Sequence, residues 1–314
     1  MRYDTHYQEG QKVQFSKMQG VTLRGLIFQP PHFDMRKKYQ AIIVVTPEGG
    51  VKEQCASLYA WHLASHGYVA LTFDPSHQGE SEGLPKYLED PAARVEDIRC
   101  AVDYLVTLPY IDENNLGIVG LGAGACYAMQ ATLTDLRLRA AAGVSTWDIG
   151  ESTRKGFPEI RHDTCFLRTM REVAEERTKR ARGAMEVTYS TYCPASLEEC
   201  TEQTPVILRE ACEYYCTPRG EYPTAVNKYL TVSKDKLAAF DPFVHLDLVS
   251  PRPVLFIVGD ESDIIAYTYG AYSKAKRPKE IFTVPGATHI DLYDKPEHVA
   301  VVVEKLLQFY RQYL

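Results

Sequence analysis

The chain has 314 residues, of which 45% are hydrophobic and 24% are charged, so it can bury one large core or two modest ones. Its 35 basic and 41 acidic side chains give a formal net charge of -6, which offers no electrostatic footprint to nucleic acid or to an anionic membrane. We therefore expect a small-molecule substrate as the partner. The composition is also compatible with a homodimer.

The N-terminal residues 1–6 lack the basic and then apolar run of a signal peptide, and no apolar stretch approaches the length that spans a bilayer. We therefore expect a cytoplasmic protein without membrane contact. The eight cysteines lack the CxxC pairs of a zinc site. Cys212 and Cys216 have helical i,i+4 spacing, but no pattern around them supports a metal, so we expect free thiols, no metal and no cofactor.

Strand-length apolar runs alternate with helix-length amphipathic segments in the first half of the chain, a pattern typical of a parallel sheet with helices on both faces. The expected strands are 41–45, 68–73, 116–120 and 139–144, and the expected helices are 54–65 and 91–105. Before them, 12–15 and 22–28 have the pattern of an antiparallel hairpin across 18–20 at the edge of the sheet.

Between 150 and 245 there are no strong strand runs, and helical patterns at 171–177 and 205–215 are separated by stretches rich in Pro, Gly and Tyr. The sheet resumes with strands at 253–258 and 280–284 and helices at 268–275 and 296–313. We expect an α/β fold with a mostly parallel central sheet flanked by helices. Its core is expected to comprise 1–149 and 246–314, with 150–245 as a helical cap insertion.

A glycine-rich turn, Gly120-Leu121-Gly122-Ala123-Gly124, lies between an expected strand and an expected helix. This is the context of the nucleophile elbow, Gly-x-nucleophile-x-Gly, of the α/β-hydrolase fold. Gly122 stands at the nucleophile position, and with no side-chain heavy atom it cannot form an acyl-enzyme. A phosphate cradle is the weaker alternative, because no Lys-Ser/Thr follows the turn. Cys126, one helical turn further on, is expected to point away from the elbow and to pack.

The catalytic histidine of this fold follows the last strand, where His289 ends the segment 285–289. The acid that orients it follows the preceding strand, and Asp263 is our first choice there, with Asp260 the second. The alternative is that these carboxylates only shape a polar turn.

Backbone N–H groups near Gly49 and at Ala123 are expected to form the oxyanion hole, although glycines in such a loop also serve as turn formers. We expect Glu48, His77 and Tyr215 to contact the substrate. A surface-loop position remains the alternative for His77. The cap tyrosines are expected to shape an apolar pocket or to pack within the cap, and they are Tyr189, Tyr192, Tyr214, Tyr215 and Tyr222.

Five segments resemble the dienelactone-hydrolase-like α/β-hydrolases, a group that includes bacterial proteins of unassigned substrate and fungal hydrolases of polyketide pathways. The segments are 50–54, 73–81, 214–220, 250–253 and 285–294. The resemblance covers most of the chain and implies the α/β-hydrolase fold. Members of the group generally carry Cys or Ser at the position that matches Gly122, so this chain departs from them at the nucleophile.

Together these features predict an enzyme of hydrolase ancestry that acts on a small carbonyl, ester or lactone substrate without a Ser or Cys nucleophile. A histidine held by a carboxylate, beside two N–H donors, can move a proton in cyclisation, elimination, isomerisation or water-activated hydrolysis. A polyketide-like substrate and a place in secondary metabolism are implied by the resemblance. The alternative is a non-catalytic ligand-binding protein that has kept the pocket.

Overall fold

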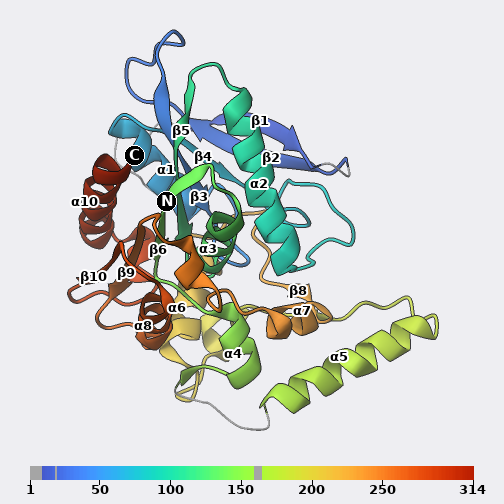
Figure 1. The fold of residues 1–314 in the computed structure, drawn as a ribbon. Coiled ribbons are helices and arrows are strands. Elements are labelled where there is room, and N and C mark those ends of the chain that lie inside the picture. The colour runs from blue at the N-terminus through green and yellow to red at the C-terminus, as the bar shows by residue number, and fades with distance from the viewer. Residues whose placement is uncertain (1–8, 18–19, 159–164) are drawn as a thin grey trace.

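A central sheet of eight strands organises the computed structural model, which describes residues 9–17, 20–158 and 165–314 (Figure 1). The strand order is β1-β2-β4-β3-β5-β6-β9-β10. The two hairpin strands are antiparallel, and all pairings from β4 to β10 are parallel. The strands are β1 (Gln11–Ser16), β2 (Thr22–Phe28), β3 (Tyr39–Val45), β4 (Val69–Phe73), β5 (Ile111–Leu121), β6 (Leu138–Val144), β9 (Val254–Gly259) and β10 (Lys279–Val284).

Helices cover both faces of the sheet (Figure 1). On one face lie α1 (Cys55–Ser65) and α10 (Pro296–Tyr313), and on the other lie α2 (Pro91–Thr107) and α3 (Gly124–Thr134). Alternation along β3 divides the core between these layers, because successive side chains of a strand point to opposite faces. Ile42 and Val44 pack with the α1 and α10 layer, and Ile43 and Val45 pack with the α2 and α3 layer.

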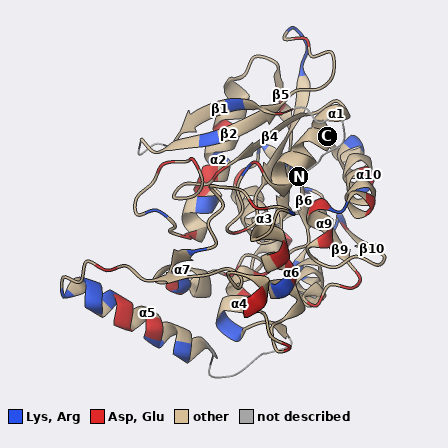
Figure 2. Ribbon diagram, turned by 180° about the vertical axis from the view of Figure 1, so that it is seen from behind, with Lys and Arg blue, Asp and Glu red and all other residues tan. Residues whose placement is uncertain are grey.

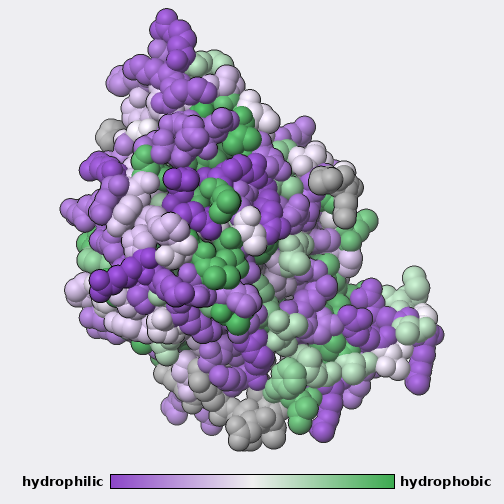
Figure 3. Space-filling view, viewed as in Figure 1, coloured by the Kyte–Doolittle hydropathy of each residue, from purple (hydrophilic) through white to green (hydrophobic). Residues whose placement is uncertain are grey.

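The segment between β6 and β9 carries helices α4 (Ile149–Lys155), α5 (Cys165–Ala181), α6 (Val206–Tyr215) and α7 (Ser233–Ala239). Two short strands, β7 (Tyr189–Ser190) and β8 (Tyr229–Leu230), pair antiparallel within it. Helix α5 projects from the body as an arm, with basic and acidic side chains interspersed along it (Figures 1 and 2). The face shown in Figure 3 is largely hydrophilic, with hydrophobic side chains in smaller areas.

The predicted fold class is confirmed, and the hairpin lies at the sheet edge as expected. The remaining helices are α8 (Ile265–Lys274) and α9 (Asp291–Asp294), with short 3-10 turns at Leu197–Glu199 and Leu246–Val249. The strands β7 and β8 were not predicted, because two-residue strands leave no periodic signal. The domain boundaries at 149 and 245 stay a prediction.

Two sequence expectations lie outside the described residues, the hairpin turn at 18–19 and the character of residues 1–6. None of the helices in the described ranges has both the length and the apolar character needed to cross a bilayer.

Candidate functional site

The elbow lies where the strand order reverses, between β3 and β5, which is where open α/β sheets form their ligand crevices. Strand β5 ends at Leu121 and helix α3 begins at Gly124. Gly122 between them has a φ of +56°, a left-handed conformation that favours glycine. Gly124 allows a close approach to the β3 loop, because an added Cβ would lie 2.5 Å from the carbonyl oxygen of Thr46. The sequence therefore builds the strained turn of a nucleophile elbow.

The hydroxyl of Tyr293 occupies the space in which a nucleophile side chain would begin. A Cβ added to Gly122 would overlap this hydroxyl and would lie 3.3 Å from the Cβ of Pro47. Tyr293 comes from the short helix α9 and is 2% exposed. Glycine at position 122 is thus matched to the tyrosine that fills the elbow.

His289 lies against the same tyrosine. Its Nε2 is 3.2 Å from the Tyr293 hydroxyl, at hydrogen-bond distance, and its ring packs edge-on against Trp147. The residue is 1% exposed, and burial lowers the pKa of His289 to about 3. Burial also raises the pKa of Tyr293 well above its ordinary value. The contact therefore joins a neutral imidazole to a neutral phenol at neutral pH.

The two candidate acids are engaged elsewhere. Asp263 accepts a hydrogen bond of 2.9 Å from the backbone N–H of Ile207, at the start of helix α6. Asp260 is exposed and accepts a hydrogen bond of 2.7 Å from the N–H of Gly286. Within the described ranges no hydrogen bond or ion pair joins His289 to either carboxylate. The structure thus brings His289 to Tyr293 and places the two carboxylates at a cap helix and at a turn.

The backbone N–H of Ala123, an expected oxyanion donor, points to a side chain of the protein itself. It donates a hydrogen bond of 3.2 Å to Oε2 of Glu48. Glu48 follows β3 and is 5% exposed. Next to it, Gly49 has a φ of +69°, and a Cβ there would lie 2.6 Å from the ring of Tyr192. The loop after β3 therefore places a carboxyl group where the fold usually binds an oxyanion.

Glu48 titrates in an unusual range for a carboxyl group. Burial raises the pKa of Glu48 to about 8, and the nearby charge of Glu89 adds to the rise. The negative charge of Glu89 is itself paired, because Arg94 donates two hydrogen bonds to its carboxylate, of 2.8 and 2.7 Å. Hydrogen bonding from Ala123 and the charge of Arg94 oppose the rise for Glu48. A carboxyl group with such a pKa can donate or accept a proton near neutral pH.

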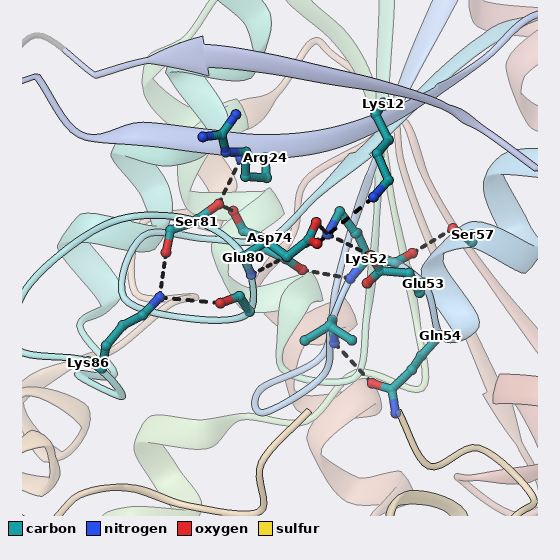
Figure 4. Close-up of polar contacts among 12 residues, drawn as sticks. Lys12, Arg24, Lys52, Glu53, Gln54, Ser57, Asp74, Glu80, Ser81 and Lys86 are labelled. Atoms are coloured by element: carbon teal, nitrogen blue, oxygen red, sulfur yellow. Dashed lines mark hydrogen bonds and ion pairs between the residues drawn. The ribbon is translucent and has the colours of Figure 1, made fainter. Parts of the chain in front are cut away.

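A buried lysine fixes the loop that carries Glu48 (Figure 4). Nζ of Lys52 lies 2.8 Å from Asp74, 2.7 Å from Glu80 and 2.6 Å from Glu53. The Lys52 N–H also donates to Asp74. Because a buried cation paired in this way is costly to displace, these contacts hold the segment between β3 and α1 in one conformation.

A cavity of about 290 Å³ opens beside Glu48. Trp147 also lines it, so its wall reaches the ring that packs against His289. Most of the wall is apolar or hydroxylated, which suits a small organic substrate with a few polar groups. The lining residues are Glu48, Trp147, Ile149, Ser152, Thr153, Gly156, Phe157, Thr169, Thr191, Tyr192, Leu208, Tyr229, Lys234 and Leu237. A hollow of about 500 Å³ on the β1–β2 hairpin involves none of the elbow residues.

Tyr215 and His77, the other residues expected to contact the substrate, lie in different parts of the structure. Tyr215 lines a second, much smaller cavity together with Glu48. His77 has its Nδ1 at 3.0 Å from the carbonyl oxygen of Pro85 in its own loop and does not line the 290 Å³ cavity. Cys126 is fully buried, its Sγ donates to the carbonyl oxygen of Trp147, and burial raises the pKa of this thiol well above its ordinary value.

Tyr293 and Trp147 were not among the residues predicted for the site. The signal for Tyr293 was its position four residues after His289, since the turn that carries His289 leads into α9 and brings the two side chains together. Trp147 lies three residues after the last residue of β6, at the carboxyl end of a sheet strand. For metals, no group of three or more His, Cys, Asp or Glu among the described residues is arranged to hold an ion.

The eight-stranded sheet, the glycine elbow after β5 and the histidine after β10, together with the family match and the relatives given next, place the chain among the enzymes of the α/β-hydrolase superfamily. The model of the dienelactone hydrolase family matches residues 23–147. Uncharacterized protein YcjY of Escherichia coli (strain K12) is 34% identical over 295 residues, which cover 94% of this chain and 95% of YcjY. The chain belongs to the dienelactone hydrolase family, as the sequence resemblance indicated.

Two further comparisons extend over nearly the whole chain. The crystal structure of hypothetical protein PA2218 from Pseudomonas aeruginosa has a TM-score of 0.90 at 28% identity, and the match covers 100% of this chain and 96% of that one. A thiohydrolase of Eupenicillium brefeldianum is 26% identical over 290 residues, which cover 90% of this chain and 88% of the relative.

Proposed function

We propose that the protein catalyses proton transfer on a small carbonyl substrate, an ester, thioester or lactone of polyketide-like kind, without a covalent acyl-enzyme. Glu48 is the group that moves the proton. The name of the thiohydrolase relative supports a thioester or a related acyl compound as the substrate. The proposal replaces the covalent step of the superfamily by acid–base chemistry at the same end of the sheet.

One observation carries the proposal, the position of the Glu48 carboxyl group. It contacts the elbow N–H of Ala123 at 3.2 Å and also lines the 290 Å³ cavity. A substrate carbonyl in that cavity lies next to a carboxyl group whose pKa burial raises to about 8. Proton exchange with such a group is favourable near neutral pH, because its pKa is close to the working pH.

His289 and Tyr293 act as positioning residues in this proposal. Neither lines the cavity, and the Tyr293 hydroxyl, which contacts His289, fills the elbow at Gly122. A neutral imidazole with a pKa of about 3 is a poor direct base at neutral pH. Loss of His289 is expected to lower turnover by loosening Tyr293, and the conservative variant H289Q is expected to retain more activity than H289A.

The test is Glu48→Gln, which keeps the size of the side chain and removes its titration. Wild-type and variant proteins are assayed on S-acetyl-N-acetylcysteamine, p-nitrophenyl acetate and dihydrocoumarin, a thioester, an ester and a lactone. We expect E48Q to lower kcat/KM by about 100-fold or more, the contribution typical of a general acid or base. Intact-mass spectra taken during turnover are expected to show no acyl adduct.

Glu53→Gln is the matched control. Glu53 lies in the same loop, burial also raises its pKa, and it does not line the cavity. Glutamine at this position keeps an acceptor for Lys52, which also stays paired with Asp74 and Glu80, so the loop is held as in the wild type. E53Q is expected to keep the wild-type kcat. An acyl adduct on the protein, or an active E48Q, would contradict the proposal. So would binding of all three compounds without turnover, which is the behaviour of a ligand-binding protein.

A further inference from the structure

Four of the eight cysteines lie between residues 193 and 216, and their thiols are close together in the structure. Sγ of Cys193 lies 4.0 Å from Sγ of Cys216, which directly follows helix α6. Burial raises the pKa of Cys212 to about 12, and the neighbouring thiols of Cys216 and Cys200 add to the rise. The segment after β7 and the end of α6 therefore meet through sulfur atoms.

The side chain of Asn227 holds Cys193 and Cys216 side by side. Its Oδ1 accepts from the backbone N–H groups of Tyr192 and Cys193, at 3.0 and 3.2 Å, and its Nδ2 donates to the carbonyl oxygen of Cys193 at 2.8 Å. The same Nδ2 donates to Sγ of Cys216 at 3.8 Å. The Cys216 thiol in turn donates to the carbonyl oxygen of Pro194 at 3.7 Å. Hydrogen bonds to both segments thus fix the approach of the two thiols.

The two thiols differ in their access to solvent. Cys193 is buried, whereas Cys216 is partly exposed. Burial raises the pKa of the Cys193 thiol, and the charge of Cys216 adds to the rise, so Cys193 is protonated at neutral pH. An oxidant that arrives from solvent therefore meets Cys216 first and finds Cys193 beside it. A partly exposed thiol with a second thiol next to it is the arrangement that converts a sulfenic acid into a disulfide.

We propose that Cys193 and Cys216 form an oxidisable pair, whose disulfide fastens the segment that carries Tyr192 to the end of helix α6. Tyr192 and Leu208 of α6 both line the 290 Å³ cavity. The Tyr192 hydroxyl also donates to Glu89 in the core at 3.2 Å. The disulfide therefore fixes two parts of the cavity wall to one another. This proposal does not depend on the proposed catalytic role of the cavity.

Hydrogen peroxide is the oxidant of this step. The Cys216 sulfur bonds to one peroxide oxygen, which breaks the O–O bond and gives a sulfenic acid and one water. The Cys193 sulfur then bonds to the Cys216 sulfur and displaces the hydroxyl group, which leaves as a second water with the proton of the Cys193 thiol. Two thiols lose two electrons in all, and the peroxide is reduced to two waters. A dithiol such as dithiothreitol reverses the reaction by thiol–disulfide exchange.

Peptide mapping of the full chain tests the pair directly. Trypsin cleaves the denatured chain after Lys and Arg, which leaves Cys193 in the peptide 183–209 and Cys216 in the peptide 210–219. Wild-type protein is reduced, freed of reductant, treated with a few equivalents of hydrogen peroxide, alkylated in urea and digested. We expect the two peptides to be joined by a Cys193–Cys216 bond in most of the protein, and to be separate after dithiothreitol.

Three variants accompany the wild type. C193S and C216S are each expected to lose the cross-link between the two peptides. C100S is the matched control, because Cys100 is also buried but lies on α2, where the neighbouring groups that raise its pKa further are carboxylates. C100S and E48Q are expected to form the cross-link as the wild type does.

Hydrogen exchange measures the effect of the bond on the cavity wall. The amides of residues 191–200 and of α6 are expected to exchange at least about tenfold more slowly in the oxidised than in the reduced wild type. The reason is that a cross-link suppresses the openings in which the two segments separate. C193S treated with the same peroxide is expected to show no such slowing.

Several results would overturn the proposal. A disulfide between other cysteines, or oxidation of Cys216 to the sulfinic acid while Cys193 stays reduced, would show that the two thiols do not react as a pair. One equivalent of zinc retained by the purified protein would show that the thiols serve a metal instead. A cross-link that leaves exchange unchanged would refute the fastening of the two segments. An active E48Q would end the proposed function and leave the thiol pair unaffected.

Discussion

Gly122 and Tyr293 form a matched pair at the elbow. An alanine at position 122 would take a left-handed φ of +56° and would overlap the Tyr293 hydroxyl. We expect G122A to lower the free energy of unfolding by about 2 kcal/mol or more, since the conformation and the overlap both oppose it. Y293F removes the overlapping atom and leaves its ring carbon at an ordinary 3.5 Å. The double variant G122A/Y293F is therefore expected to be less destabilised than the sum of the two single variants, as measured by urea unfolding.

The control for this double-mutant cycle is the single variant Y293F. It removes the contact of the Tyr293 hydroxyl with His289 Nε2, and we expect it to lower the free energy of unfolding by about 1 kcal/mol. Additive effects of the two substitutions would show that the overlap relaxes without cost. The same pair explains why restoring a nucleophile is not a single-step change. A serine or cysteine at 122 needs Tyr293 to move or to lose its hydroxyl.

At the scale of elements, Asp263 connects the sheet to the cap. Its carboxylate accepts from Ile207 at the start of α6, a helix that packs into the core with Ile207, Ala211 and Tyr214. We expect D263A to increase hydrogen exchange across α6 and to lower its local stability by about 1 kcal/mol, as the loss of a helix cap does. D263N keeps an acceptor for the same N–H and is expected to increase exchange in α6 less than D263A does.

This comparison also tests Asp263 as the catalytic acid. A carboxylate that orients His289 would lose its effect in D263N as fully as in D263A, so kcat would fall equally in both variants. If Asp263 only caps α6, kcat is expected to fall in D263A, which loosens α6, and to fall less in D263N. Hydrogen exchange measured by mass spectrometry and kcat on the thioester probe, taken on the same samples, decide between the two roles.

The elements themselves were largely predictable from the sequence, and the contacts of the site were not. Periodicity located β3, β9 and α10 closely, because each buries a continuous or regular apolar pattern. The elbow was recognisable from its glycines. The Tyr293 hydroxyl in the elbow and the Glu48 carboxyl on the Ala123 N–H depend on how α9 and the β3 loop pack together, which no local pattern encodes.

At the scale of the whole molecule, two buried groups give opposite dependences of stability on pH. Burial raises the pKa of Glu48 from 4.5 to about 8, so between these values the folded chain holds a proton that the unfolded chain has lost. Stability therefore falls as the pH rises from about 4.5 to about 8. Burial lowers the pKa of His289 from 6.5 to about 3, so stability falls as the pH drops through that range.

The two effects oppose each other between pH 4.5 and 6.5 and separate on either side. E48Q removes only the first of them. The stability of the wild type relative to E48Q is therefore expected to decrease by a few kcal/mol between about pH 4.5 and pH 8 and to level off above it, since each shifted pKa unit is worth about 1.4 kcal/mol. Urea unfolding of both proteins across this range measures the difference. Parallel curves would mean that Glu48 titrates at its ordinary pKa in the folded protein, and the acid–base role at neutral pH would lose its basis.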